Sequence, residues 1–235
     1  INRFSDRKLD RIMDNVIELR EVGVWYKKKV SFFRTEKFWG LRNVSLQVKR
    51  GETLGVIGGN GAGKSTLLKL LSGILDPDEG KVLRKVRNIS LLTLGLGFLP
   101  NLSGRDNAVL SGILLGKTKD EMRNLLDDII DFSEIGDAIN DPVRTYSSGM
   151  RARLSFATAL KADSDMILVD ELLGVGDRQF RKKSTLAMKE QISSEKTVVI
   201  VSHNEELIKE VCDRLIWIDD GTIKAQGSVE EVRKQ

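Results

Sequence analysis

The stretch Gly58-Gly59-Asn60-Gly61-Ala62-Gly63-Lys64-Ser65-Thr66 decides the fold class. It fits G-x-x-x-x-G-K-[ST], a loop whose backbone N–H groups surround a polyphosphate. In such a loop Lys64 reaches the terminal phosphates and Ser65 binds magnesium. The short apolar segment 53–57 precedes the loop, and leucines at helical spacing follow it. A strand, a glycine loop and a helix in this order predict a site for the phosphates of a nucleotide and its Mg²⁺ at a helix N-terminus.

Apolar patterning elsewhere predicts an α/β protein. Alternating residues indicate half-buried strands at 16–22 and 44–48, and continuous apolar runs indicate buried strands at 166–169 and 197–201. A helical stretch at 178–192 separates the last two, which gives a β-α-β rhythm. The segment 104–160 is mainly helical, with apolar helical faces at 108–115, 122–130 and 150–160. Residues 76–80 read as a turn, and Asp219-Asp220-Gly221 predicts a hairpin between 214–218 and 222–225.

Two adjacent carboxylates follow the strand predicted at 166–169. Ligands bind at the carboxyl ends of strands in open α/β sheets, so Asp170 and Glu171 are placed to act on a bound nucleotide. We expect Asp170 to hold magnesium and Glu171 to polarise the water that attacks the terminal phosphate. An ordinary acidic helix N-terminus is the open alternative.

The chain has one histidine, His203, just after the strand predicted at 197–201. It can therefore face the same sheet edge as the carboxylates. A structural role is the simpler interpretation of an isolated histidine. In this position His203 is also a candidate for contacting the terminal phosphate.

A third motif, Tyr146-Ser147-Ser148-Gly149-Met150-Arg151, resembles the signature of ABC-transporter nucleotide-binding domains. The order of motifs from about residue 16 onward is also similar to that family. The resemblance implies one nucleotide-binding domain over 1–235, with an N-terminal extension at 1–15. It further implies a P-loop core with a mixed or parallel sheet, an N-terminal antiparallel β subdomain, and a helical signature subdomain inserted at about 104–160.

The same resemblance implies that two copies close head to tail around two ATP molecules. Ser147, Ser148 and Gly149 of one copy would complete the site of the other, where the N-terminus of a helix can bind phosphate oxygens. Asp177 would connect the two sites. An aromatic ring ahead of the loop would stack on adenine, and we choose Tyr26, with Trp25 and Trp39 as rivals.

Further sequence stretches resemble those of the ATPases that export lipid-linked polysaccharides such as O-antigen, capsule or teichoic acid. The stretches that carry this resemblance are 38–45, 94–98, 102–107, the serine-for-glycine signature and Gly174-Val175-Gly176-Asp177. Two positions depart from the pattern. Thr93 stands where most relatives carry a glutamine that contacts the metal, and its hydroxyl is the shorter candidate for that contact. Met150 replaces the usual signature glutamine, in keeping with this subfamily.

A membrane partner is implied at the segment 94–107, where the family docks a coupling helix of its permease. The glycines and apolar residues there suit a groove that receives a helix, although a flexible loop is the simpler interpretation. Phe98 and Leu99 are the residues that we expect to make this contact. The resemblance thus places the chain at the cytoplasmic face of the inner membrane, beside integral-membrane permease subunits.

Composition agrees with a globular protein that spans no membrane by itself. The 235 residues are 40% hydrophobic and 31% charged with a formal net charge of +4, and the single thiol of Cys212 excludes an internal disulfide. We interpret Lys27-Lys28-Lys29 as a solvated face and expect no nucleic acid partner. A soluble ABC ATPase of ribosomes or DNA is an alternative, although such relatives carry two cassettes or a coiled-coil insertion. A P-loop GTPase or kinase would leave the signature unexplained.

Overall fold

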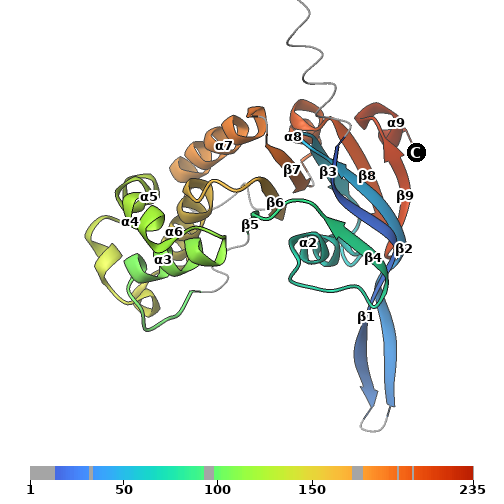
Figure 1. Ribbon diagram of the computed structural model, residues 1–235, viewed down its shortest axis with the longest axis horizontal. Coiled ribbons are helices and arrows are strands. Elements are labelled where there is room, and N and C mark those ends of the chain that lie inside the picture. The colour runs from blue at the N-terminus through green and yellow to red at the C-terminus, as the bar shows by residue number, and fades with distance from the viewer. Residues whose placement is uncertain are drawn as a thin grey trace, which may run out of the picture. The chain divides into compact units, whose positions relative to one another are not determined.

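The computed structural model describes residues 14–31, 34–92, 98–170, 177–194, 196–202 and 204–234. These fall into two compact units, one formed by 1–86 with 195–235 and the other by 87–194 (Figure 1). Within the described ranges, no helix combines the length and the apolar character needed to cross a bilayer.

The first unit contains an antiparallel sheet in the order β2-β1-β4. Alternate side chains of β1 and β2 are buried, as the alternating pattern predicts, but both strands are longer than expected. Bulges shift the register between β1 and β2 at several points. The strands are β1 (Asn15–Ser31), β2 (Arg34–Lys49) and β4 (Glu79–Arg84).

The same unit holds strands in the order β7-β3-β8-β9. Strand β3 runs parallel to both β7 and β8, whereas β8 and β9 form an antiparallel hairpin. All of β7 and most of β3 are buried, which explains their continuous apolar sequences. The elements are β3 (Thr53–Ile57), α2 (Lys64–Ser72), β7 (Thr197–Val201), α8 (Glu205–Val211), β8 (Arg214–Asp219), β9 (Thr222–Gly227) and α9 (Val229–Arg233).

A buried ion pair fixes the entry to β3. Glu52 is 5% exposed, and its carboxylate accepts from Arg214 at 3.0 and 3.2 Å and from the backbone N–H of Lys49 at 2.6 Å. Beside it, the N–H of Thr53 donates to Asp213 at 2.8 Å. Removing either member of such a pair leaves a buried charge uncompensated. The pair therefore sets the start of the strand that leads into the glycine loop.

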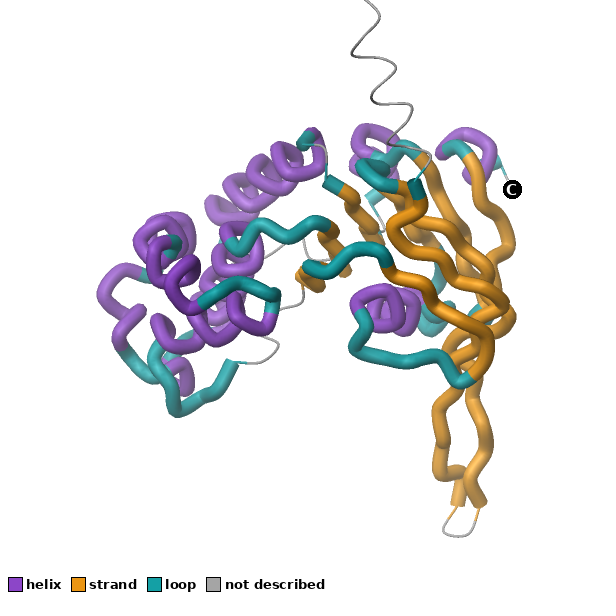
Figure 2. Tube along the Cα trace, viewed as in Figure 1, coloured by secondary structure: helices purple, strands orange, loops and turns teal. Residues whose placement is uncertain are grey.

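The second unit is mainly helical, with one parallel strand pair, β5 with β6 (Figure 2). Its core includes buried residues from α3 to α6, among them Ala108, Met122, Ile129 and Leu154. The elements are β5 (Ile89–Leu92), α3 (Gly104–Leu114), α4 (Lys119–Asn124), α5 (Leu126–Ser133), η1 (Gly136–Asn140), η2 (Val143–Thr145), α6 (Ser148–Lys161), β6 (Met166–Asp170) and α7 (Arg178–Ser193).

The structure confirms the α/β class, the strand-loop-helix order around residue 58 and the hairpin at 219–221. Asp220 and Gly221 both adopt positive φ in that hairpin, at 45° and 68°. The predicted helix at 122–130 is instead two helices that meet at Leu125, and the turn at 76–80 ends in strand β4. The sequence patterns did not predict β4, β5, α8 and α9, which have four to seven residues each. The subdomain boundaries proposed above stay a prediction.

Candidate functional site: a phosphate loop and a signature helix

The glycine loop turns sharply between β3 and α2. Gly61 and Gly63 have φ of 79° and 109°, a region that side chains disfavour. A Cβ on Gly63 would lie 2.4 Å from the carbonyl oxygen of Gly40, and a Cβ on Gly58 would lie 2.1 Å from that of Ile218. The loop therefore needs glycine at 58 and 63 because neighbouring backbone leaves no room.

The hairpin turn between β8 and β9 is hydrogen-bonded to the phosphate loop. The N–H of Gly221 donates to the carbonyl of Ala62 at 3.0 Å, and the carbonyl of Gly221 accepts from Arg42 at 2.7 Å. Ala62 is buried, whereas Gly59, Asn60 and Gly61 are exposed. The loop is thus anchored on one side and open to solvent at its crest.

Lys64 is the first residue of α2 and is 9% exposed. Its ammonium group donates to the carbonyl oxygens of Gly58 and Gly59, each at 2.8 Å. The charge is therefore held within the loop. The helix has Gly63 as a cap without a side-chain hydrogen bond, so its N-terminal backbone dipoles add to this positive potential. The arrangement suits a polyphosphate.

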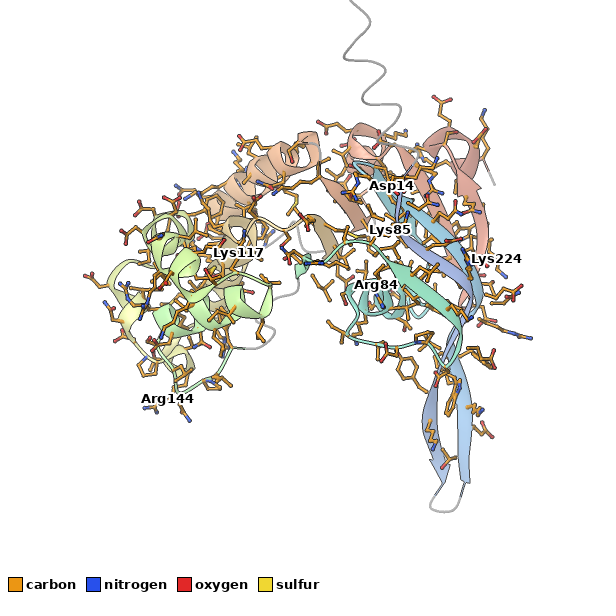
Figure 3. The ribbon with its side chains drawn as sticks, viewed as in Figure 1. Asp14, Arg84, Lys85, Lys117, Arg144 and Lys224 are labelled. Carbon is orange, nitrogen blue, oxygen red and sulfur yellow. The ribbon has the colours of Figure 1, made fainter. Side chains whose placement is uncertain are left out.

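The far end of α2 is also held. Arg84 of β4, labelled in Figure 3, donates to the carbonyls of Leu70 and Leu71 at the last turn of the helix. A guanidinium at a helix C-terminus satisfies carbonyls that have no partner within the helix. The phosphate-loop helix is thus fixed at both ends by strands of the same unit.

Tyr26 is the aromatic residue that the structure brings to the loop. Its hydroxyl lies 3.2 Å from the hydroxyl of Thr66, and its ring packs against Gly40. The ring remains 38% exposed. Trp25 and Trp39 pair with each other across β1 and β2, one position away from Tyr26, so their side chains lie on the other face of this ribbon.

The signature residues lie at the start of α6 in the second unit. Ser147 is the N-cap, and its hydroxyl accepts from the N–H of Met150 at 3.1 Å. Ser147 and Ser148 are exposed, and a Cβ on Gly149 would meet only the Ser147 hydroxyl, at 3.7 Å. The helix therefore presents an exposed N-terminus that favours an anion.

Tyr146, just before this helix, is a buried anchor. Its hydroxyl donates to the carbonyl of Ala138, and a Cβ on Gly104 would lie 2.2 Å from that hydroxyl. Burial, with a further contribution from Asp141, raises the pKa of Tyr146. The tyrosine therefore stays neutral and fixes the approach to the signature helix.

Backbone hydrogen bonds connect the residues just before the signature to the segment that begins at residue 98. The N–H of Arg144 donates to Pro100 and that of Val143 to Leu102, both at 2.9 Å. Asn107 is fully buried and holds the same segment, because its amide bonds the N–H of Leu99 and the carbonyls of Leu99, Leu102 and Ser103. Residues 98–103 are thus held to the helical unit by several backbone and side-chain hydrogen bonds.

Asp177 is the N-cap of α7, where one carboxylate oxygen accepts from Gln179 and Phe180 at 3.0 Å. Its other oxygen pairs with Arg153 of α6. No sequence pattern singles out Arg153, since its role depends on α6 and α7 lying together. Asp170 ends β6 and is half-buried.

Three predicted site residues, Glu171, His203 and Thr93, lie outside the described residues. So do 94–97, within the proposed permease contact, and 174–176, ahead of Asp177. The predictions for these positions rest on the sequence alone. The phosphate loop belongs to one unit, and Ser147, Asp170 and Asp177 belong to the other.

The fold and the phosphate loop together define an ATP-binding cassette. The structure is similar to a dimeric ATP-binding cassette solved in a post-hydrolysis state with ADP and Pi, with a TM-score of 0.74, 24% identity, and coverage of 91% of this chain and 98% of that one. It is also similar to an ATP-binding subunit of an ABC transporter, with a TM-score of 0.76, 19% identity, and coverage of 94% and 92%. At these identities the likeness concerns the fold.

Sequence comparisons show which family the chain belongs to. The ABC transporter family model matches residues 41–174, more than half of the chain. An O-antigen export ATP-binding protein of Klebsiella pneumoniae is 38% identical over 206 residues, which are 88% of this chain and 84% of that protein. The chain therefore belongs to the ABC transporter family.

Two longer relatives are similar as well. An O-antigen export ATP-binding protein of Myxococcus xanthus is 44% identical over 88% of this chain and 48% of its own length. A teichoic acids export ATP-binding protein of Lactococcus lactis is 45% identical over 83% of this chain and 42% of its own length. The chain thus spans about half the length of these two curated relatives.

Proposed function

We propose that this chain is the ATP-hydrolysing subunit of an exporter that moves a lipid-linked polysaccharide of the O-antigen type across the cytoplasmic membrane. The observation that carries the proposal is the similarity to the Klebsiella O-antigen export protein over most of both chains. The phosphate loop, with Lys64 held at the start of α2, supplies the matching chemistry. A teichoic acid exporter is the second candidate, favoured by the similarity to the Lactococcus protein.

In this proposal the backbone of residues 58–66 surrounds the phosphates of ATP, and Lys64 turns from the loop carbonyls to the terminal phosphates. The ring of Tyr26 stacks on adenine. Its partly exposed position beside Thr66 supports this choice over Trp25 and Trp39. Glu171 polarises the attacking water and His203 contacts the terminal phosphate, as the sequence predicts.

Magnesium fits the residues proposed to hold it. Ser65 and Asp170 offer a hydroxyl and a carboxylate, and Mg²⁺ prefers such hard oxygen ligands. Bound there, the ion neutralises charge on the phosphates. Thr93 is a further hydroxyl candidate that rests on the sequence alone.

The functional unit in this proposal is a head-to-tail dimer. Ser147, Ser148 and Gly149 of one copy complete the ATP site of the other, and Asp177 connects the two sites. The exposed N-terminus of α6 supports an anion-binding role for the signature. The dimer works at the cytoplasmic face of the membrane with integral-membrane permease subunits.

Leu99 is the sharpest probe of the permease contact. It is 49% exposed, while its backbone is held by Asn107. Phe98, by contrast, packs against the core of the helical unit, so a charge there would also disturb folding. The hydrogen bonds that Arg144 and Val143 donate to the carbonyls of Pro100 and Leu102 give a route from this contact to the signature.

The test uses the Leu99→Glu variant of the chain, co-expressed with its permease. ATP binding, ATP hydrolysis and polymer export are measured. We expect ATP binding to persist while export falls at least about tenfold, because a charge in an apolar helix contact opposes docking. The matched control is Leu186→Glu, an exposed leucine on α7 of the same unit. Export by Leu99→Glu at the rate of the control would contradict the docking site.

A further inference from the structure

The end of β1 (residues 24–31) and the start of β2 (residues 34–41) form a two-stranded ribbon that projects from the first unit (Figure 1). Pairing of β1 with β4 ends at Gly23 and Glu79. Beyond that point, the described part of the chain supplies no third strand. An isolated pair of strands is only marginally stable in water. The outer part of the ribbon therefore lacks the third strand that supports the rest of the sheet.

This ribbon concentrates the chain's charge and aromatic residues. Residues 24–41 contain five basic residues and one acidic residue, so their formal net charge equals the +4 of the whole chain. They also contain six of the thirteen aromatic residues. The remainder of the chain is balanced in charge.

One face of the ribbon combines both features. Trp25 is opposite Trp39, and Lys27 is opposite Lys37 two positions further along, so these four side chains share a face. The ammonium of Lys37 lies 4.1 Å from the centroid of the Trp25 ring, and that of Lys27 lies 6.0 Å from it. We call these four residues the cationic-aromatic face.

The pairing of Lys27 with Lys37 is unfavourable by itself, because like charges directly opposite each other destabilise a strand pair. Contact with the Trp25 ring compensates in part. An anionic surface would remove the repulsion. Tyr26 lies on the other face of the ribbon, so this surface is distinct from the proposed adenine contact.

We propose that the cationic-aromatic face docks on the anionic lipid headgroups of a membrane surface. Lysines near such a surface gain from its negative potential, and indole rings favour the boundary between headgroups and acyl chains. Single-stranded nucleic acid also combines negative charge with stacking bases. The membrane is favoured because a transporter subunit works beside one, and in this choice the inference rests on the proposed function.

The test is co-sedimentation of the purified chain with lipid vesicles at low and at physiological salt. Vesicles of phosphatidylcholine with about 30% phosphatidylglycerol supply the anionic surface, and pure phosphatidylcholine vesicles are the reference. We expect binding to the anionic vesicles only, weakened by salt. Lys27→Glu/Lys37→Glu should lower that binding about tenfold or more.

The matched control is Lys119→Glu/Lys224→Glu, which makes the same change in net charge at two exposed lysines outside the ribbon (Lys224 is labelled in Figure 3). It should retain most of the binding. Equal losses in the two double variants would overturn the inference, since net charge alone would then explain the binding. So would tighter binding of a single-stranded RNA that is lost only in the ribbon variant.

Failure of this inference is distinguishable from failure of the proposed function. If the chain ignores anionic vesicles but its ATPase is stimulated by the permease, the docking face is wrong and the transport function stands. If vesicle binding follows the ribbon lysines but no permease stimulates hydrolysis, the transport function fails instead. Unchanged ATP binding and melting temperature in the ribbon variant would show that its fold is intact.

Discussion

Arg153 of α6 forms an ion pair with Asp177, the N-cap of α7. The guanidinium also lies 5.0 Å from the centroid of the Phe180 ring and 3.4 Å from the carboxylate of Glu134. Lys183 joins the same cluster through Glu134 at 2.7 Å. The helix that begins with the signature is therefore tied to the residue that the family resemblance assigns to the dimer interface.

A double-mutant cycle tests this link. We expect Arg153→Ala and Asp177→Ala each to lower the free energy of unfolding, with a coupling energy of about 1 kcal/mol between them. The coupling is modest because Asp177 is partly exposed. Urea denaturation of the two single variants and the double variant gives the value, and strictly additive effects would show that the ion pair contributes nothing.

Asn107 should be among the most sensitive polar residues of the helical unit. It is fully buried and makes four hydrogen bonds with backbone atoms of residues 99–103. Asn107→Ala would leave these groups without partners, so we expect a loss of about 2–4 kcal/mol in the free energy of unfolding. Asn140→Ala, at an exposed asparagine, is the control and should cost under about 0.5 kcal/mol. Similar losses in both variants would contradict the role of Asn107.

Comparing Gly63→Ala with Gly59→Ala distinguishes the effect of backbone strain from the effect of adding a methyl group to the loop. Gly63→Ala meets the Gly40 carbonyl at 2.4 Å and requires a positive φ, whereas a Cβ on Gly59 meets nothing within 4 Å. We expect Gly63→Ala to destabilise the protein by about 2–4 kcal/mol. Gly59→Ala should leave the melting temperature close to that of the wild type. A normal melting temperature for Gly63→Ala would mean that the loop relaxes at little cost.

The single thiol gives a pH prediction. Burial, with a smaller contribution from Asp213, raises the pKa of Cys212 from 9.0 to about 12. At pH 9 the thiolate fraction should therefore be several hundred times lower in the folded chain than in the unfolded chain. Reaction with a disulfide reagent should be slowed by about that factor relative to the chain in denaturant. Because the folded pKa is the higher one, this group's contribution to stability is present below about pH 9 and falls as the pH rises toward 12.

Much of the fold could be predicted because its strongest signals are local. A short run of residue types is enough to predict each of several elements. These are the phosphate loop, the buried strands β3, β6 and β7, and the hairpin at Gly221. The short helices α8 and α9 could not be predicted from periodicity, since seven and five residues give too few turns.

Long-range contacts were less accessible to sequence reasoning. Nothing in the sequence around Arg153 indicates that it meets Asp177, 24 positions away. Alternation of residue types does not predict how far β1 and β2 extend as a ribbon, and the contact of Lys37 with the Trp25 ring depends on strand pairing that lysine-rich sequence alone does not indicate. The roles of Glu171, His203 and Thr93 remain predictions from the sequence.

The most direct measurement of the central claim is ATP hydrolysis by a mixture of two inactive variants, Lys64→Ala and Ser147→Ala. If each ATP site combines the phosphate loop of one copy with the signature of the other, a mixed dimer regains one intact site. Random mixing in equal amounts should then restore up to about a quarter of wild-type activity, although neither variant is active alone. If the mixture hydrolyses ATP no faster than the separate variants while gel filtration of a tagged pair shows that they exchange subunits, the shared site is contradicted.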